Sequence, residues 1–338
     1  LSPSLANYAS SQSWDGPRTG PVGQTSKSVI YIGSDFKNGG VAGVYRQFQV
    51  AAKELGWNVS RVDGKGDLAV LRKGFFDSVR SHPDGIVLGG FQADEVSDLI
   101  THAKKAKIIL VGWHSAEAPG PTQDLFVNIS TDAMEIASIA AQYAINIGHG
   151  KLGVVFFNDS RFDIANLKTK TMRKVIKQCK TCKVLSVEDL AISKAGKEVP
   201  AAVTRLNKKF GHAWTHTLAI NDVYFDHINF PLKNVGRDDI VNISAGDGSQ
   251  KALSRIRSGL SQQVATVAEP LSIQGWQLAD ELNRAFAGKP PSGYVTKPML
   301  ITTEVLQRVG EREIESRMGY REAYRAIWRG KPAATKDR

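Results

Sequence analysis

Short apolar runs and amphipathic stripes alternate along most of the chain. In the stretch Ser28–Trp57, residues 29–32 are apolar, a loop of glycine and polar residues follows, and apolar positions between 41 and 55 recur at steps of three and four. The run fits a strand buried on both faces, and the stripe fits a helix with one buried face, ended by Gly56. The stretch predicts one strand–loop–helix unit whose loop lies where open α/β sheets bind ligands.

The same alternation continues to about residue 147 and restarts at residue 152. Further apolar runs predict strands at residues 58–62, 85–90, 108–113, 125–129, 152–157, 183–187, 217–220, 240–245, 263–268 and 298–302. Strands that alternate with helices form parallel sheets through right-handed crossovers. Two runs of similar length therefore predict an α/β protein with two parallel, doubly wound lobes.

We expect the chain to divide into an N-terminal arm and two lobes. Residues 1–27 are rich in Ser, Gly and Pro and are expected to form an extended arm, with Trp14 as an anchor onto the body. The predicted boundaries are 28–130 plus 271–297 for the N-terminal lobe, and 131–270 plus 298–338, with a helical C-terminal extension, for the C-terminal lobe.

The net charge of the 338-residue chain is +11, which raises the question of nucleic-acid binding. The basic residues are scattered, however, and one dense stretch, 308–338, is interleaved with glutamates. That pattern favours a solvated helical face, so no nucleic-acid partner is expected. No run of eighteen apolar residues predicts a transmembrane helix. The chain starts at Leu1 rather than methionine, which fits a processed or trimmed N-terminus, and any signal peptide is then expected to have been removed.

The two cysteines, Cys179 and Cys182, form one CxxC motif. A zinc site would need a second pair or suitably spaced histidines, and redox catalysis is a further alternative. We favour a disulfide in an oxidising compartment, which would contribute about 2 kcal/mol.

Polar and aromatic residues occur together after the predicted strands. Hydroxyls of a sugar or polyol need carboxylates, amides and arginine for hydrogen bonding, while C–H faces need aromatic rings. The candidate ligand-binding residues are Asp35, Asn38, Phe91, Gln92, Trp113, His114, Arg161, Phe162, Asn221, Tyr224, Asp247 and Glu269.

Structural roles are the alternatives for these candidates. Asp35 and Asp247 are alternatively helix caps, and Asn38 is alternatively a turn residue. Core packing is the alternative for Trp113 and Phe162, and packing or solvation is the alternative for Gln92 and Tyr224. His114 is alternatively hydrogen-bonded within the protein, Arg161 paired with Asp159 or Asp163, Asn221 bonded within its own loop, and Glu269 a hinge residue.

Enzyme signatures are scarce. The sequence has no GxSxG, GxxxxGK[ST] or HExxH motif. Residues 38–43, NGGVAG, are similar to a dinucleotide fingerprint, but Asn38 occupies the first glycine position. We therefore expect no nucleotide, other cofactor or metal, and no catalytic residues.

The segments SVIYIGSD, DGIVLGG, VGWH, FFNDSRF, LAINDVYFD, SAGDGS and VAEPLSIQGWQLADELNRA together support a family resemblance. Over about residues 25–302 the chain resembles the periplasmic sugar-binding proteins of the ribose-binding-like type, the type I solute-binding proteins of ABC importers. The resemblance implies two Rossmann-like lobes joined by a three-strand hinge, with the ligand enclosed between them.

The resemblance also implies roles for four residues. The family's amide falls on Asn221, its aspartate on Asp247, its hinge-side carboxylate or amide on Glu269 and its cationic residue on Arg161.

Two positions depart from the family pattern. Gly39-Gly40-Val41 replaces the family's paired aromatics, and Trp113-His114 replaces Asp-Arg. Aromatic stacking is therefore expected at Trp113, Phe91 or Phe162.

The sequence thus predicts a monomeric periplasmic receptor that passes a neutral monosaccharide or sugar alcohol to a membrane permease of an ABC importer. Hinge closure is expected near residues 128–131, 269–271 and 298–301. The alternatives are the ligand-sensing core of a sugar-responsive transcription regulator, a chemoreceptor partner, or an enzyme using Asp35 and Asp247 as a carboxylate pair.

Overall fold

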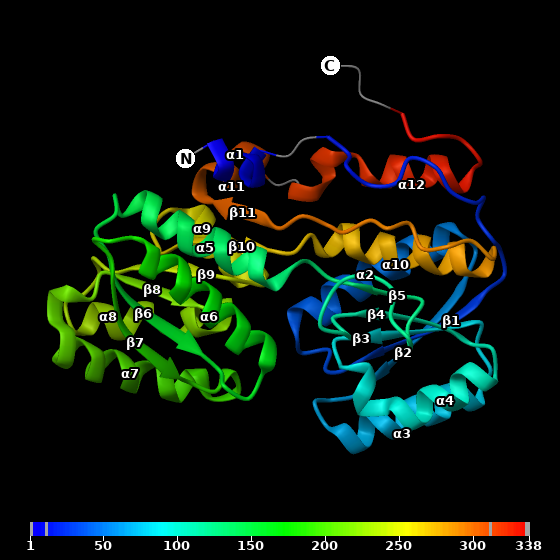
Figure 1. Ribbon diagram of the computed structural model, residues 1–338, viewed down its shortest axis with the longest axis horizontal. Helices are drawn as coiled ribbons and strands as arrows, with labels where there is room; N and C mark the ends of the chain where they lie inside the picture. Colours follow the sequence, from blue (N-terminus) through cyan, green and yellow to red (C-terminus); the bar gives the residue numbers. More distant parts are fainter. Residues whose placement is uncertain (1–2, 11–12, 311–312, 335–338) are drawn as a thin grey trace. The chain divides into compact units, whose positions relative to one another are not determined.

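The computed structural model describes residues 3–10, 13–310 and 313–334, and the chain divides into two compact units (Figure 1). Unit 1 consists of Leu1–Ser11, Asp132–Glu269 and Lys297–Ile314; unit 2 consists of Gln12–Thr131, Pro270–Thr296 and Glu315–Arg338. Among the described helices, none combines the length and apolar character that a membrane span requires.

Unit 2 is built on a five-stranded parallel sheet with the order β2-β1-β3-β4-β5. Its strands are β1 (Ser28–Gly33), β2 (Asn58–Asp63), β3 (Gly85–Gly89), β4 (Ile109–Trp113) and β5 (Val127–Ile129). Every residue of the central strand β3 is buried, which is why it reads as an uninterrupted apolar run.

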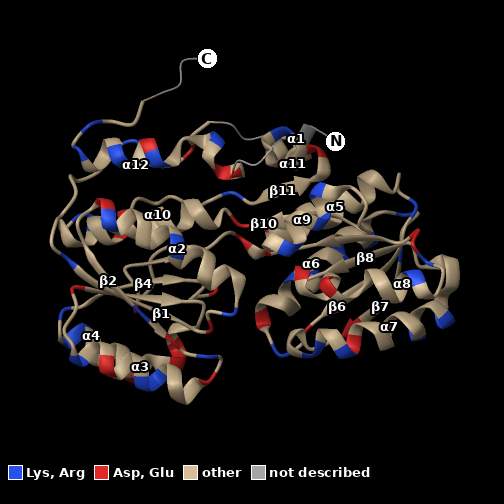
Figure 2. Cartoon of the chain, turned by 180° about the vertical axis from the view of Figure 1, so that it is seen from behind, with Lys and Arg blue, Asp and Glu red and all other residues tan. Residues whose placement is uncertain are grey.

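Helices cover both faces of this sheet (Figure 1). They are α2 (Gly39–Glu54) and α10 (Leu271–Phe286) on one face, and α3 (Leu68–Arg80), the short helix η1 (Ala93–Val96) and α4 (Ser97–Lys105) on the other. Neighbouring strand residues alternate between the two layers: Tyr31 packs with the first and Ile32 with the second. Charged residues of both signs lie on α3 and α4 (Figure 2), where Arg72 pairs with Asp98.

Unit 1 is built on a six-stranded sheet with the order β11-β10-β9-β8-β6-β7, in which only β11 is antiparallel to its neighbour. The strands are β6 (Gly153–Asn158), β7 (Lys183–Asp189), β8 (His216–Ala219), β9 (Val241–Ser244), β10 (Gln263–Ala268) and β11 (Met299–Thr302). The helices are α1 (Pro3–Ser10), α5 (Ala133–Ile147), α6 (Asp163–Gln178), η2 (Ile192–Lys194), α7 (Ala195–Phe210), η3 (Gly211–Ala213), η4 (Asp222–His227), α8 (Asn229–Asn234), α9 (Gln250–Ser258) and α11 (Thr303–Val309).

The predicted α/β class with two parallel-sheet lobes is confirmed. The predicted disulfide is also present: Cys179 and Cys182, with Cα atoms 5.3 Å apart, link the end of α6 to the turn before β7. The described residues contain no cluster of three or more His, Cys, Asp or Glu side chains that could hold a metal ion.

The N-terminal segment differs from the expected extended arm. Its first part, α1, is helical and packs in unit 1, where Tyr8 donates to Glu135 at 2.6 Å. Residues 13–27 do run without helix or strand in unit 2. Trp14 is the expected anchor: its ring packs edge-on against Tyr324 at 5.2 Å and Tyr294 at 5.4 Å.

The closing segment is the second difference. The sequence assigned all of 298–338 to the C-terminal lobe, but the structure groups the chain from Glu315 onward with unit 2. The short helix η5 (Ile314–Met318) leads into α12 (Tyr320–Trp328), whose Trp328 ring stacks on Trp276 of α10 at 5.6 Å. The Trp328 indole also donates to the buried Asp280 carboxylate at 2.9 Å. These contacts with α10 decide the placement, and no periodicity within the segment encodes them.

The polar side of α10 explains why unit 2 includes these outer segments. Arg284 donates to Asp280 at 2.8 Å and to the backbone oxygen of Thr19 at 2.8 Å. The Asn283 side-chain oxygen accepts from the backbone N–H of Gln24 at 2.7 Å. The segment before β1, together with Trp328 of α12, therefore satisfies polar groups that would otherwise be buried without partners.

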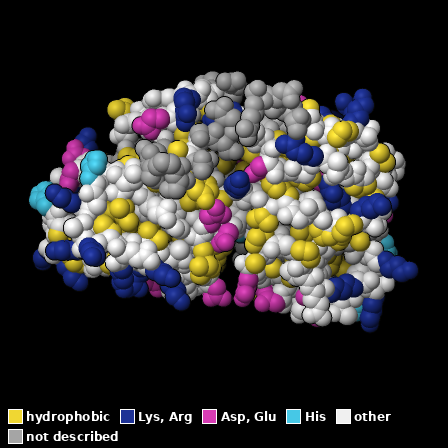
Figure 3. Space-filling view, turned by 45° about the horizontal axis from the view of Figure 1, so that its top comes forward, with side chains coloured by type: hydrophobic (Ala, Val, Ile, Leu, Met, Phe, Trp, Pro, Cys, Tyr) yellow, Lys and Arg dark blue, Asp and Glu magenta, His cyan; other side chains and the backbone are white. Residues whose placement is uncertain are grey.

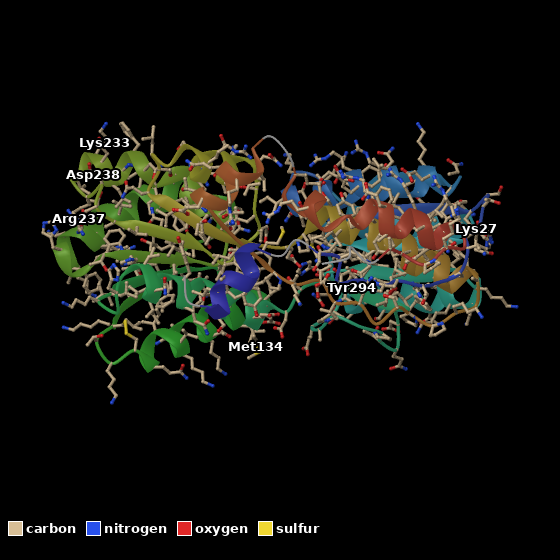
Figure 4. The ribbon with its side chains drawn as sticks, turned by 90° about the horizontal axis from the view of Figure 1, so that it is seen from above. Lys27, Met134, Lys233, Arg237, Asp238 and Tyr294 are labelled. Carbon is tan, nitrogen blue, oxygen red and sulfur yellow. A yellow bond between two sulfur atoms is a disulfide. The ribbon has the colours of Figure 1, made fainter. Side chains whose placement is uncertain are left out.

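The buried carboxylate of Glu281 on α10 is only partly satisfied by hydrogen bonds. One carboxylate oxygen accepts from Ser292 N at 2.9 Å, whereas the other has no hydrogen-bond partner among the described residues. Burial raises the pKa of Glu281 to about 7. The neighbouring ionisable groups are Asp280 and Arg284 on α10, Tyr324 on α12, and Tyr294, labelled in Figure 4, which donates to Asp15.

We expect the stability of the protein to fall as pH rises from about 4.5 to about 7, because folded Glu281 retains its proton over that range and the unfolded chain does not. The loss is about 3 kcal/mol, at about 1.4 kcal/mol per pKa unit. Glu281→Gln keeps the acceptor for Ser292, so it should raise the melting temperature near pH 8 and flatten the pH dependence. The exposed Glu117→Gln is the matched control. Identical pH profiles for wild type and Glu281→Gln, measured by circular dichroism, would contradict this assignment.

Candidate functional site

In unit 1, the carboxyl ends of β8 and β9 bring Asn221 and Asp247 together. The Asn221 amide donates to the Asp247 carboxylate at 3.0 Å, and its oxygen accepts from Val223 N at 2.9 Å. Asn221 therefore ties its own loop, as the structural alternative proposed, and also joins that loop to the next one. Both side chains are half-buried, so their remaining polar atoms face a partly exposed edge of the sheet.

Asp222 holds these two loops in place, and the sequence reading did not select it. One of its carboxylate oxygens accepts from Gly248 N at 2.7 Å and Ser249 N at 3.0 Å, and the other accepts from the Gln263 amide at 2.9 Å. The side chain is 1% exposed, and burial raises the pKa of its carboxyl above the usual range. Asp222 fixes the loop that presents Asp247 and has little surface for a ligand.

Lys168 is the second residue that the sequence reading missed. It belongs to the buried stripe of α6 with Ala165 and Met172, so a lysine at an apolar helix position was the available signal. Its ammonium donates to Ala245 O at 2.6 Å, next to the Gly246–Asp247 loop, and the side chain is 7% exposed. An ammonium has three N–H donors, and the described residues accept one of them.

Arg161 follows β6 and is held by its neighbour Asp159. Its guanidinium makes two hydrogen bonds to that carboxylate, at 2.9 and 2.6 Å, and remains 54% exposed. The hydrogen-bonded guanidinium lowers the pKa of the Asp159 carboxyl. The ring of Phe162 is 48% exposed and lies 5.6 Å from the guanidinium carbon. Phe162 is therefore not the core residue that the structural alternative proposed.

Tyr224 and Glu269 are buried in unit 1. Tyr224 is fully buried, and its hydroxyl donates to Leu190 O at 2.7 Å, so its position fits the alternative role in core packing. Glu269 is 5% exposed and directly follows β10, at the end of the unit 1 segment Asp132–Glu269.

In unit 2, Asp35 and Asn38 lie in the loop between β1 and α2. Asn38 caps α2 by accepting from Gly40 N at 2.9 Å and Val41 N at 3.2 Å. Asp35 accepts from Lys37 N at 2.9 Å, so it stabilises the turn rather than the helix end. Asp35 therefore keeps acceptor capacity beyond this bond, whereas Asn38 already uses both lone pairs of its side-chain oxygen and can offer a ligand only its amide N–H donors.

Trp113 and His114 end β4. The Trp113 indole is 5% exposed and donates to Gln274 at 2.8 Å. It also covers Gly40 so closely that a Cβ there would lie 2.7 Å from the ring, which explains glycine at that helix position. The His114 ring is half-buried and packs edge-on against Trp113 at 4.4 Å.

Phe91 and Gln92 follow β3 and face different surroundings. Phe91 is 5% exposed and belongs to the core layer shared with α3 and α4. Gln92 is exposed, and its backbone oxygen accepts from Glu95 N. Of the predicted aromatic contacts, Phe162 has the largest exposed fraction.

Each unit thus contains its own set of residues that can contact a ligand. Unit 1 has Asn221, Asp247 and Lys168, with Arg161 and Phe162 after β6; unit 2 has Asp35, Asn38, Gln92 and His114. A carboxylate, an amide and an ammonium provide acceptors and donors in the mixture that hydroxyl groups require. Lys and Arg side chains elsewhere are spread over the visible surface of both units (Figure 3).

A family model described as a periplasmic binding protein domain matches residues 23–290. A search of curated proteins found no match. An ABC transporter solute-binding protein from Agrobacterium vitis with bound allitol is 20% identical, with a TM-score of 0.71, and the match covers 84% of this chain and 98% of that one. The 5-methylthioribose transporter solute-binding protein from Thermotoga lettingae is 15% identical, with a TM-score of 0.73 and coverages of 90% and 99%. A glycerol-bound solute-binding protein from Mycobacterium smegmatis is 14% identical, with a TM-score of 0.70 and coverages of 86% and 98%.

The two aspartates of the unit 1 loops should respond differently to substitution. Asp222→Ala leaves three donors without their acceptor and should destabilise unit 1 by about 2 kcal/mol or more, lowering the melting temperature by about 4 °C or more. Asp247→Ala removes one hydrogen bond at a partly exposed position and should change the melting temperature little. Thermal melts of the two variants provide the comparison. Equal melting temperatures would show that Asp222 does not hold the loops.

Proposed function

The chain belongs to the periplasmic binding protein domain family, and from that premise we propose that it is a periplasmic receptor for a neutral monosaccharide or sugar alcohol, delivering it to an ABC importer. The observation that carries the proposal is the Asn221–Asp247 pair beside the buried Lys168 ammonium. Asn221 and Asp247 contact each other after two strand ends, where sheets of this class bind ligands, and the Lys168 ammonium donates to Ala245 O, two residues before Asp247.

The ligand class follows from the balance of donors and acceptors. Asp247 can accept from two hydroxyls, Asn221 can both donate and accept, and Lys168 can donate to a ring or hydroxyl oxygen. The structural relatives with bound allitol, glycerol and 5-methylthioribose support a small polyhydroxylated ligand. The carboxylate and the ammonium balance each other in charge, which favours a neutral molecule over a sugar acid.

We propose that the protein binds its ligand without catalysing a reaction. The family consists of solute-binding receptors, and the site residues of unit 1 suit hydrogen bonding to hydroxyls. We further propose that the protein acts as a monomer in the periplasm and that Asp35, Asn38, Gln92 and His114 of unit 2 complete ligand recognition. Trp113 and Phe162 remain the proposed aromatic contacts.

A thermal-shift screen tests the receptor proposal. Neutral pentoses, hexoses, glycerol and hexitols should include at least one ligand that raises the melting temperature, because binding to the folded state alone adds about 2.7 kcal/mol at a concentration of 100 Kd. Aldonates and sugar phosphates are the matched charged probes. A shift with charged probes alone would overturn the neutral-ligand proposal, and turnover of a bound sugar would overturn the receptor proposal.

Two substitutions in unit 1 test the site with whichever sugar the screen identifies. Asp247→Ala and Lys168→Met should each weaken binding at least about tenfold, or about 1.4 kcal/mol, because each removes a charge-assisted hydrogen bond. Arg161→Ala should have a smaller effect, because Asp159 already occupies its guanidinium. Calorimetric titration measures all three. Unchanged affinity in Asp247→Ala with an intact melting transition would remove this edge of unit 1 from the ligand site.

A further inference from the structure

The second half of α6 and the turn after it carry charge of one sign. Residues 164–187 contain seven Lys or Arg residues and no Asp or Glu, and Asp163 and Glu188 are the nearest acids on either side. Lys168 is the buried member described above, and Arg173 is half-buried. The exposed members are Lys170, Lys174, Lys177, Lys180 and Lys183.

Folding adds Lys151 to this group. Lys183 N donates to Leu152 O at 2.7 Å, which places the start of β7 beside the start of β6. The hydroxyl of Thr181 donates to Gly150 O, so the CxxC turn contacts the residue next to Lys151. The disulfide, drawn in yellow in Figure 4, links the two ends of this turn. We call Lys151, Lys170, Lys174, Lys177, Lys180 and Lys183 the basic face.

The charges of the basic face are not neutralised within the described part of the chain. None of its six lysines forms an ion pair there, whereas Lys73, Lys104 and Arg205 each pair with a carboxylate. A favourable interaction with the helix dipole accounts for lysines in the last turn of α6, such as Lys177, but not for Lys151 or Lys183, which lie outside the helix.

The composition of the basic face identifies the kind of partner. Lysine ammonium groups are flexible point charges, unlike arginine forks, which select planar groups with fixed geometry. The face contains no aromatic side chain on which a nucleic-acid base could stack. We propose that the basic face docks unit 1 onto the anionic headgroups of a lipid bilayer, where each lysine adds to a diffuse electrostatic attraction.

This surface is separate from the candidate ligand site of unit 1. Lys151 and Lys183 lie at the amino ends of β6 and β7, whereas Asn158 and Asp189 lie at the carboxyl ends of the same strands. Six or seven residues of strand span about 20 Å, which is beyond the Debye length of about 8 Å at physiological salt. Docking through the basic face therefore leaves the strand ends open, and the proposal goes beyond the receptor function without depending on a particular sugar.

Vesicle co-sedimentation tests the proposal with the full chain and no sugar. The protein should sediment with vesicles of phosphatidylcholine and phosphatidylglycerol but not with pure phosphatidylcholine. Salt of about 1 M, where the Debye length is about 3 Å, should release it. The triple variant Lys174→Glu, Lys177→Glu, Lys180→Glu should bind at least about tenfold more weakly. The variant with arginine at the same three positions should bind like the wild type, because the attraction depends on the charge of the side chains and not on their shape.

A matched control separates the basic face from net charge. Lys208→Glu, Lys233→Glu and Lys289→Glu together reverse three exposed lysines elsewhere and give the same net charge. This control should keep most of the vesicle binding, with all variants showing wild-type melting transitions. Equal losses in both triple variants, or no binding of the wild type to anionic vesicles at low salt, would overturn the proposal. Either result would leave the sugar screen unaffected, so the two proposals fail independently.

Discussion

The requirement that buried polar groups find partners governs the architecture around α10. This helix is buried on all sides, yet it contains Asp280, Asn283 and Arg284. Their partners come from the segment before β1 and from Trp328 of α12. Without those partners the helix would bury ionised groups at a cost of several kcal/mol each, so the segment before β1 and the helix α12 are structural parts of unit 2.

Much of the fold was predictable because two-sided burial leaves a simple pattern. Interior strands such as β3 and β6 are buried at every residue, so their apolar runs identify them directly. The placement of α1 and α12 was not predictable, because long-range contacts decide it. Trp276 and Asp280 lie about fifty residues before Trp328, and no local spacing encodes that pairing.

Part of the candidate site was likewise predictable from the sequence, and part was not. Residues directly after strands reach the sheet edge, so Asn221 and Asp247 could be selected from sequence and do contact each other. Phe91 and Tyr224 also follow strands, but their side chains turn into core layers, a choice that depends on neighbouring helices. Lys168 was not predicted as a site residue because it lies within the apolar stripe of a helix. Asp222 was not predicted because it lies beside Asn221, whose amide is the more evident ligand group.

The Trp328–Asp280 hydrogen bond has an evolutionary consequence. A lineage that loses α12 deprives a fully buried carboxylate of a donor, and the remaining partner, Arg284, is itself held by a backbone oxygen from the segment before β1. Deletion of the C-terminal helix is therefore tolerated most readily after position 280 has become uncharged. Positions 280 and 328 should change together among relatives, and an apolar residue at position 280 should accompany chains that end near α11.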